Sequence, residues 1–174
     1  MNLSANRVVL GLDPGSRSTG YGLVQECSGE LRLLHTGCIR SNAQEDLSQR
    51  LGRIFQGISR IILEFGPQEA AVEDVFVARN TASALKLGQA RGAAIAACAS
   101  LELQVFTYEP NLIKKTLVGA GKADKNQVAF MAGRLLNTDP KGWSLDSSDA
   151  LAAAICHLNM QRRLSWEQRT GARG

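Results

Sequence analysis

Apolar residues change their spacing near Glu45, and this change limits the possible folds more than any other feature of the sequence. Before it, the stretches 7–12, 19–25 and 31–39 have continuous or alternating apolar residues and are separated by turn residues, which is typical of hairpin strands. After it, apolar residues recur every three or four positions over 47–65, which indicates an amphipathic helix. Hairpins therefore come first in the chain, and helices connect the later strands.

The rest of the chain alternates between short strands and helices. Strands are expected at 69–75 and 105–108, and helices from Asn80-Thr81 to about 101, from Pro110, from an Asp124 cap to Asn137, and over about 147–163. This order predicts an α/β fold with a five-stranded mixed sheet, three antiparallel strands and then two parallel ones, and helices on both faces. We assign residues 1–163 to a single domain and expect residues 164–174 to be a disordered basic tail.

Composition and charge narrow the class of protein. The 174 residues suffice for one buried core, and no apolar run approaches the roughly 20 residues that cross a bilayer. The four cysteines form no Cys-x-x-Cys pair and are expected to be free thiols, and His157 is expected to be a core or edge histidine. With a short polar N-terminus that resembles no secretory signal, the chain is predicted to be cytoplasmic. The net charge of +4 is a weak hint of a polyanionic partner.

Four acidic residues occupy unusual positions. Asp13 directly follows a buried strand, Glu73 lies within an apolar strand, and Asp146 and Asp149 lie three apart at the start of an apolar helix. Each has a simpler explanation: Asp13 as a turn residue, Asp146 and Asp149 as helix-capping acids, and Glu73 as a solvent-facing strand end. If the strands that carry Asp13 and Glu73 are parallel, both acids fall at carboxyl ends, where α/β sheets bind ligands.

A cluster of four carboxylates needs positive charge to be stable. Like charges a few ångströms apart raise each other's pKa, and a divalent cation removes this cost. Carboxylate oxygens suit Mg²⁺ or Mn²⁺, and two such ions can activate a water and stabilise the departing oxygen of a phosphodiester. The sequence offers no plausible Ser-His-Asp or Cys-His pair for covalent catalysis.

Several sequence blocks together point to one family. These blocks are 11–22 (GLDPGSRSTGYG), 72–76 (VEDVF) with Asn80, 84–92 (ALKLGQARG), 114–119 (KKTLVG) with Gly121 and Lys125, and 146–152 (DSSDALA). In this order they resemble the motifs of the RuvC family of Holliday junction resolvases, over roughly residues 7 to 160. The resemblance implies an RNase H-like fold and cleavage of four-way DNA junctions.

The resemblance also implies roles for individual residues. Asp13, Glu73, Asp146 and Asp149 match the catalytic metal-binding acids, Lys114 and Lys125 match the basic residues that contact the scissile phosphate, and Phe76 matches an aromatic at the opened junction centre. A homodimer and a branch-migration complex as partner are implied as well. The chain departs from the family where a Gln often follows the Glu, because Asp74 stands there and adds a fifth acid.

Further DNA contacts are predicted on two basic stretches. Arg79, Lys86 and Arg91 could line a phosphate track, as could Lys115 and Lys122, although solvated surface charge is the ordinary explanation of each. Gly88 and Gly92, four residues apart, could pack against a symmetry mate or against the sheet.

The sequence therefore predicts a Mg²⁺-dependent endodeoxyribonuclease, with Mn²⁺ as a possible substitute and two ions per active site. It would nick two opposed strands of a four-way junction and leave 5′-phosphate ends. Three alternatives remain: another RNase H-like nuclease, an ATP-binding domain of the sugar-kinase or actin type, and a non-enzymatic nucleic-acid-binding module. The lysine-rich block and the paired acids of the last helix have no evident role in the ATP-binding alternative.

Overall fold

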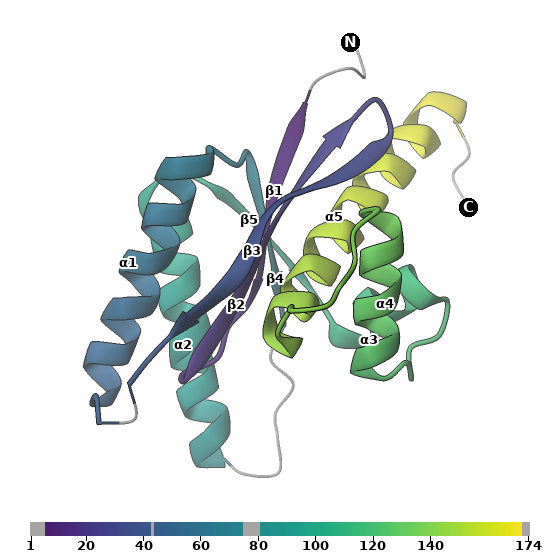
Figure 1. The fold of residues 1–174 in the computed structure, drawn as a ribbon. Helices are drawn as coiled ribbons and strands as arrows, with labels where there is room; N and C mark the ends of the chain where they lie inside the picture. The colour runs from purple at the N-terminus through teal and green to yellow at the C-terminus, as the bar shows by residue number, and fades with distance from the viewer. Residues whose placement is uncertain (1–5, 43, 75–80, 172–174) are drawn as a thin grey trace.

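A five-stranded mixed sheet forms the centre of the molecule (Figure 1). The computed structural model describes residues 6–42, 44–74 and 81–171. Its strands are β1 (Arg7–Asp13), β2 (Ser18–Cys27), β3 (Glu30–Arg40), β4 (Glu69–Glu73) and β5 (Gln104–Tyr108), in the spatial order β3-β2-β1-β4-β5. The pairs β1/β2 and β2/β3 are antiparallel, and β1/β4 and β4/β5 are parallel. This confirms the predicted sheet.

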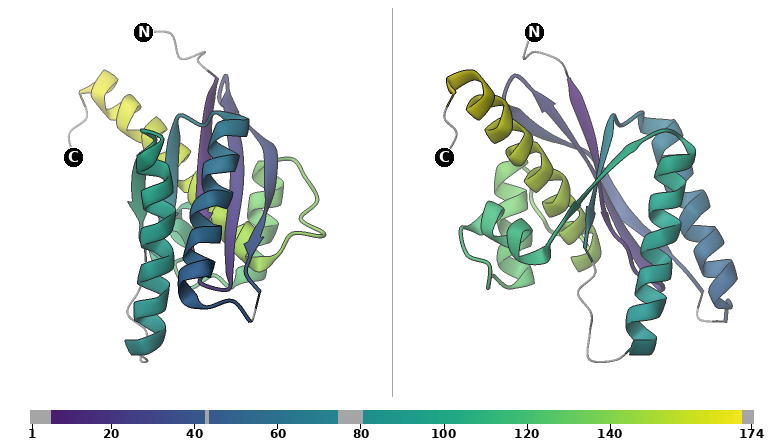
Figure 2. Two further views of the ribbon diagram at one scale, coloured as in Figure 1. Left: turned by 90° about the vertical axis from the view of Figure 1, so that its left-hand side faces the viewer. Right: turned by 180° about the vertical axis from the view of Figure 1, so that it is seen from behind.

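Helices cover both faces of the sheet, as predicted (Figure 2). One face carries α1 (Leu47–Phe65) and α2 (Thr81–Ser100), and the other carries α3 (Pro110–Val118), α4 (Lys125–Leu135) and α5 (Leu145–Thr170). The apolar side chains of β1 divide between these faces, with Leu10 and Leu12 packed under α1 and α2 and Val9 packed under α5. Because side chains alternate along the strand, β1 contributes to two separate hydrophobic cores.

Helix ends follow the chemistry of their terminal residues. Asp46 caps α1 and Asp124 caps α4, each in a reciprocal capping box with the glutamine three residues later. Pro110 occupies the first turn of α3, as predicted. Gly66 ends α1 in the left-handed conformation, with φ of 57°.

Helix α5 lies so close to the sheet that only glycines fit beneath its first turns. A Cβ atom on Gly11 would collide with the backbone of Ala150, and one on Gly20 would collide with the backbone of Asp146. A Cβ on Gly22 would come within 2.5 Å of the Leu151 side chain. Since Gly11 pairs with Gly22 across β1 and β2, these glycines form a bare surface that fixes the depth of the first turns of α5.

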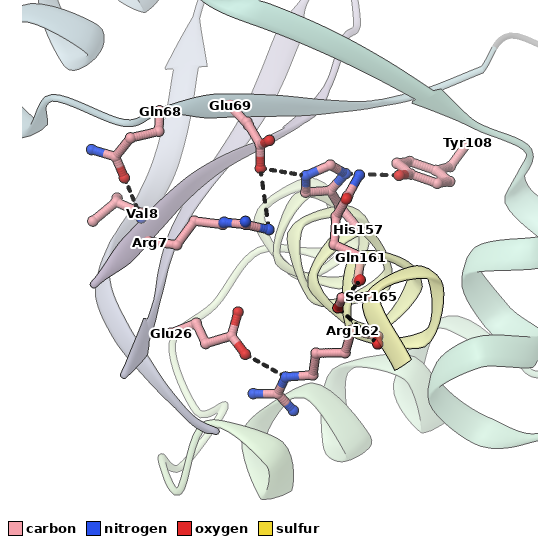
Figure 3. Close-up of polar contacts among 10 residues, drawn as sticks. All are labelled: Arg7, Val8, Glu26, Gln68, Glu69, Tyr108, His157, Gln161, Arg162 and Ser165. Atoms are coloured by element: carbon pink, nitrogen blue, oxygen red, sulfur yellow. Dashed lines mark hydrogen bonds and ion pairs between the residues drawn. The ribbon is translucent and has the colours of Figure 1, made fainter. Parts of the chain in front are cut away.

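Polar contacts fasten the later turns of α5 to three strands (Figure 3). The fully buried His157 ring lies between Glu69 of β4, whose Oε2 is 2.9 Å from Nε2, and Tyr108 of β5, whose Oη is 2.7 Å from Nδ1. Further along, Arg162 Nε donates to Glu26 Oε1 of β2 over 2.5 Å. His157 is therefore a core histidine, as expected, with both ring nitrogens bonded.

The start of α5 differs slightly from the approximate prediction, and one expectation about its end was wrong. The helix begins at Leu145 rather than Ser147, because the Ser144 side chain accepts from the Ser147 N–H as an N-cap. It also continues to Thr170, whereas a disordered tail was expected from residue 164. An i,i+4 ion pair between Arg163 and Glu167 supports this last part of the helix. No helix among the described residues is long and apolar enough to cross a membrane.

Candidate active site

Asp13 and Glu73 come together at the carboxyl ends of two parallel strands. The register of β1 and β4 pairs Leu12 with Val72, so the next residue of each strand is one of the two acids. Leu12 and Val72 both pack under α1 and α2. Because side chains alternate along a strand, Asp13 and Glu73 both lie on the opposite face, toward α5.

The start of α5 brings the second pair of acids to the same place. Gly20 of β2 pairs with Asp13 of β1, and the backbone of Asp146 lies directly over Gly20. Asp149 lies three residues further along α5, and its side chain is 13% exposed. The glycine surface thus places Asp146 and Asp149 beside the two strand-end acids. The sequence alone indicated the parallel strands but not this close approach.

The charges of these acids act on one another. Burial raises the pKa of Asp13 to about 8, and the nearby charges of Glu73, Asp149 and Asp146 add to the rise, while Lys125 opposes it. Burial also raises the pKa of Glu73, and Asp149 adds to the rise, while a hydrogen bond with Asp13 and the charges of Lys125 and Lys114 oppose it. Since that bond favours the ionised form of Glu73, Glu73 accepts and Asp13 donates in it. The four acids therefore form one electrostatic cluster.

Two of the predicted lysines lie against this cluster. Lys125, the first residue of α4, places Nζ 2.5 Å from Asp149 Oδ2. Burial lowers the pKa of Lys125, but the hydrogen bond and ion pair with Asp149 outweigh it, so the pKa lies above its usual value. Lys114 on α3 is close enough for its charge to favour ionised Glu73. Of the remaining basic candidates, Lys86, Lys115 and Lys122 are exposed.

The fifth acid, Asp74, points away from the cluster. It follows Glu73 and therefore lies on the side of α2, where its Oδ1 is 3.3 Å from Nη2 of Arg91. The same Arg91 nitrogen donates to Thr107 Oγ1 over 2.9 Å, so this arginine, predicted to contact DNA, is held within the protein. Asp74 thus adds no charge beside Asp13.

Two other predicted contacts, Phe76 and Arg79, lie outside the described residues. The two α2 glycines are described, and a Cβ on Gly88 or Gly92 would meet nothing within 4 Å. Their face of α2 therefore does not pack against the sheet, which was one of the two alternatives.

The donor set suits a hard divalent cation, although its side chains are not arranged as a complete coordination sphere. Over 6–42, 44–74 and 81–171, no three acid, histidine or cysteine side chains are spaced as ligands of one ion. Instead, Asp13 and Glu73 are joined by a proton, and Asp149 is neutralised by Lys125. Carboxylates that need a proton or an ammonium group to lie together are the kind of oxygen ligands that Mg²⁺ and Mn²⁺ bind.

Comparison with known proteins identifies the family. Residues 9–157 match the family model described as crossover junction endodeoxyribonuclease RuvC. This chain belongs to the RuvC family. All four acids and both lysines of the cluster lie within the matched residues.

Individual RuvC proteins are similar along nearly the whole chain. The proteins of Solidesulfovibrio magneticus and Oleidesulfovibrio alaskensis are 56% and 58% identical over 91% and 88% of this chain, and each match covers 92% of the relative. Thermus thermophilus RuvC, solved in complex with a Holliday junction substrate, superimposes with a TM-score of 0.84 at 34% identity. That match covers 90% of this chain and 96% of the Thermus chain. The fold is thus the RNase H-like fold of RuvC.

Proposed function

We propose that this protein is an endodeoxyribonuclease that resolves four-way DNA junctions by nicking two opposed strands. The observation that carries the proposal is the convergence of Asp13, Glu73, Asp146 and Asp149 into one cluster beside two lysines. Similarity to a RuvC protein solved with a Holliday junction supports the choice of substrate over an RNA–DNA hybrid or ATP. The reaction would leave 5′-phosphate ends.

The four acids would hold Mg²⁺, or Mn²⁺ in its place, with two ions in each active site. When bound, the ions would polarise the attacking water and the leaving oxygen of the phosphodiester. Because burial and the neighbouring acids raise the pKa of Asp13 to about 8, metal binding by Asp13 would be favoured at higher pH. Asp146 and Asp149 would be held in position by α5, which the glycine surface keeps close to β1 and β2.

Lys125 and Lys114 would act on the phosphate. Asp149 holds the ammonium group of Lys125 at the cluster, so this group can stabilise the negative charge that develops on a phosphate bound there. Lys114 contributes positive charge near Glu73. Positive charge above an acidic cluster also lowers the repulsion between the protein and the DNA backbone.

The remaining contacts and partners are proposals of the same kind. Lys86, Lys115 and Lys122 are exposed and would contact junction phosphates, as would Arg79, and Phe76 would stack on a base near the junction centre. Arg91 could join them only by leaving Asp74 and Thr107. We further propose a homodimer that meets through the open Gly88 and Gly92 face of α2, action in the cytoplasm, and association with a branch-migration complex.

A synthetic four-way junction with labelled arms tests the proposal. With Mg²⁺ the protein should produce paired nicks at symmetric positions, and a ligase should reseal them because the ends carry 5′-phosphates. Asp13→Asn should abolish nicking and leave junction binding largely intact. Asp139→Asn, the same change at an exposed acid in the loop before α5, is the matched control and should cut normally. Cleavage by Asp13→Asn at the wild-type rate would refute the assignment of Asp13.

A further inference from the structure

A cavity with a mixed polar and apolar lining lies beside the acidic cluster, toward the β3 edge of the sheet. It is open to solvent, has a volume of about 380 Å³, and is bounded by β3 and by the loop that leads into α5. Cys38 and Arg40 of β3 line it on one side, and Trp143 and Ser144 line it on the other. Its size is at the lower end of the range of about 300–1,000 Å³ found for ligand pockets.

The sheet register fixes how far this cavity lies from the acids. Cys38 of β3 pairs with Gly20 of β2, which pairs with Asp13 of β1. Two strand spacings, or about 10 Å, therefore separate Cys38 from Asp13 along one row of the sheet. Arg40 lies two residues further along β3, opposite Ser18, at the same end of the sheet as the acids. Lys114 lies on α3, which follows β5 at the opposite edge of the sheet.

Three uncharged polar side chains of the cavity, those of Cys38, Ser144 and Ser147, bond to one another. The Cys38 thiol contacts the Ser144 hydroxyl at 2.9 Å, and Ser144 Oγ also bonds to the side chain and the backbone N–H of Ser147. These contacts hold β3 against the first turn of α5. They leave no strong donor among the three side chains for a ligand.

Arg40 differs from the other lining groups. Its side chain is exposed, and it makes no hydrogen bond or ion pair within the described part of the chain. Among the described lining residues it alone is charged. An exposed guanidinium in an open cavity is suited to an anion, above all to the paired oxygens of a phosphate.

We propose that this cavity is a subsite for the cleaved DNA strand, in which Arg40 binds a backbone phosphate next to the one that is cut. The proposal rests on the nuclease function proposed above and adds the path of the cleaved strand across the active site. A strand with its scissile phosphate over Asp13 would run from the lysine side toward β3. Since every nucleotide carries one phosphate, a flanking phosphate would reach Arg40 within about two nucleotides of the cut.

Salt dependence of junction binding gives the first test. Binding of a synthetic four-way junction is measured in chelator, so that nothing is cut, at several salt concentrations for wild type and for Arg40→Gln. Each protomer of the proposed dimer would lose one phosphate contact, so the negative slope of log K against log salt should become less steep by about 1.4–1.8. Arg60→Gln, the same change at an exposed position of α1 on the other face of the sheet, should match wild type. An unchanged slope for Arg40→Gln would overturn the subsite.

Neutral phosphates then locate the contact. Junctions that each carry one methylphosphonate near the cleavage site should bind wild type more weakly when the neutral group stands at the contacted position. Arg40→Gln should be insensitive at that position and keep wild-type sensitivity elsewhere. If Arg40→Gln shows the full wild-type interference pattern, Arg40 contacts no phosphate there. Failure of wild type to bind or cut the junction would instead refute the nuclease proposal, so the two failures are distinguishable.

Discussion

Asp13→Asn should remove a pH dependence from the stability of the metal-free protein. The pKa of Asp13 is raised from 3.8 to about 8 by burial and by the acids around it. Between these two values the folded state holds a proton that the unfolded state has released. The free energy of unfolding therefore falls as the pH rises from about 4 to about 8. The stabilisation that comes from the extra proton of the folded state is fully present only below about pH 4.

The size of the effect comes from the same shift. One proton that only the folded state binds changes the free energy of unfolding by up to about 1.4 kcal/mol for each pH unit. Asparagine at position 13 cannot titrate, so the stability of Asp13→Asn relative to wild type should increase by up to this amount for each unit between pH 5 and pH 8. Above about pH 8 the difference should become constant.

Urea unfolding in chelator at pH 5, 6, 7 and 8 measures this difference. Asp139→Asn provides the control, because Asp139 is exposed and its curve should run parallel to that of wild type. Glu73 contributes a slope of the same sign, and because it is hydrogen-bonded to Asp13 the difference between the two proteins reports the titration of the pair. Parallel curves for wild type and Asp13→Asn would show that Asp13 is not held protonated by the cluster, and the reasoning would fail.

Three further changes test other parts of the structure. Lys125→Ala removes the ammonium group next to Asp149 and should slow nicking about 100-fold or more. Lys141→Ala, the same change at a lysine whose side chain is 90% exposed, should not slow it, and equal rates for the two variants would return Lys125 to ordinary surface charge. Gly11→Ala forces α5 away from β1, so it should lower the free energy of unfolding in urea by about 1–3 kcal/mol and should also reduce nicking. Gly52→Ala in α1 adds a Cβ that meets no atom and should raise the free energy of unfolding by about 0.5–1 kcal/mol. Tyr108→Phe leaves His157 Nδ1 buried without its partner and should cost about 1–3 kcal/mol; an unchanged midpoint in urea would contradict this.

Much of the fold could be predicted because local chemistry and long-range structure agree. The turn after Asp13, the cap at Asp124, the first-turn proline Pro110 and the change of apolar period all occur where the sequence placed them. The position of α5 could not be predicted in this way. Its start depends on Ser144, which is one of three serines near that point, and its continuation to Thr170 depends on packing and i,i+4 contacts that composition does not reveal.

The candidate site was partly predictable for a similar reason. The acids were evident because carboxylates at a strand end and at a helix start are unusual in apolar surroundings. That Asp74 would turn to Arg91 is a consequence of strand alternation, once the face of Glu73 is known. Arg40 carried no such signal, because its place near the acids comes from the pairing of β3 with β2, which joins residues far apart in the sequence.

Anomalous diffraction from crystals soaked in Mn²⁺ tests the central idea most directly. The structure predicts manganese peaks between β1, β4 and the first turn of α5, with carboxylate oxygens of Asp13, Glu73 and Asp149 at about 2.0–2.2 Å. The ion should take the place of the proton between Asp13 and Glu73 and draw Asp149 from Lys125. Manganese bound elsewhere, with these acids still joined to one another and to Lys125, would contradict the proposed active site.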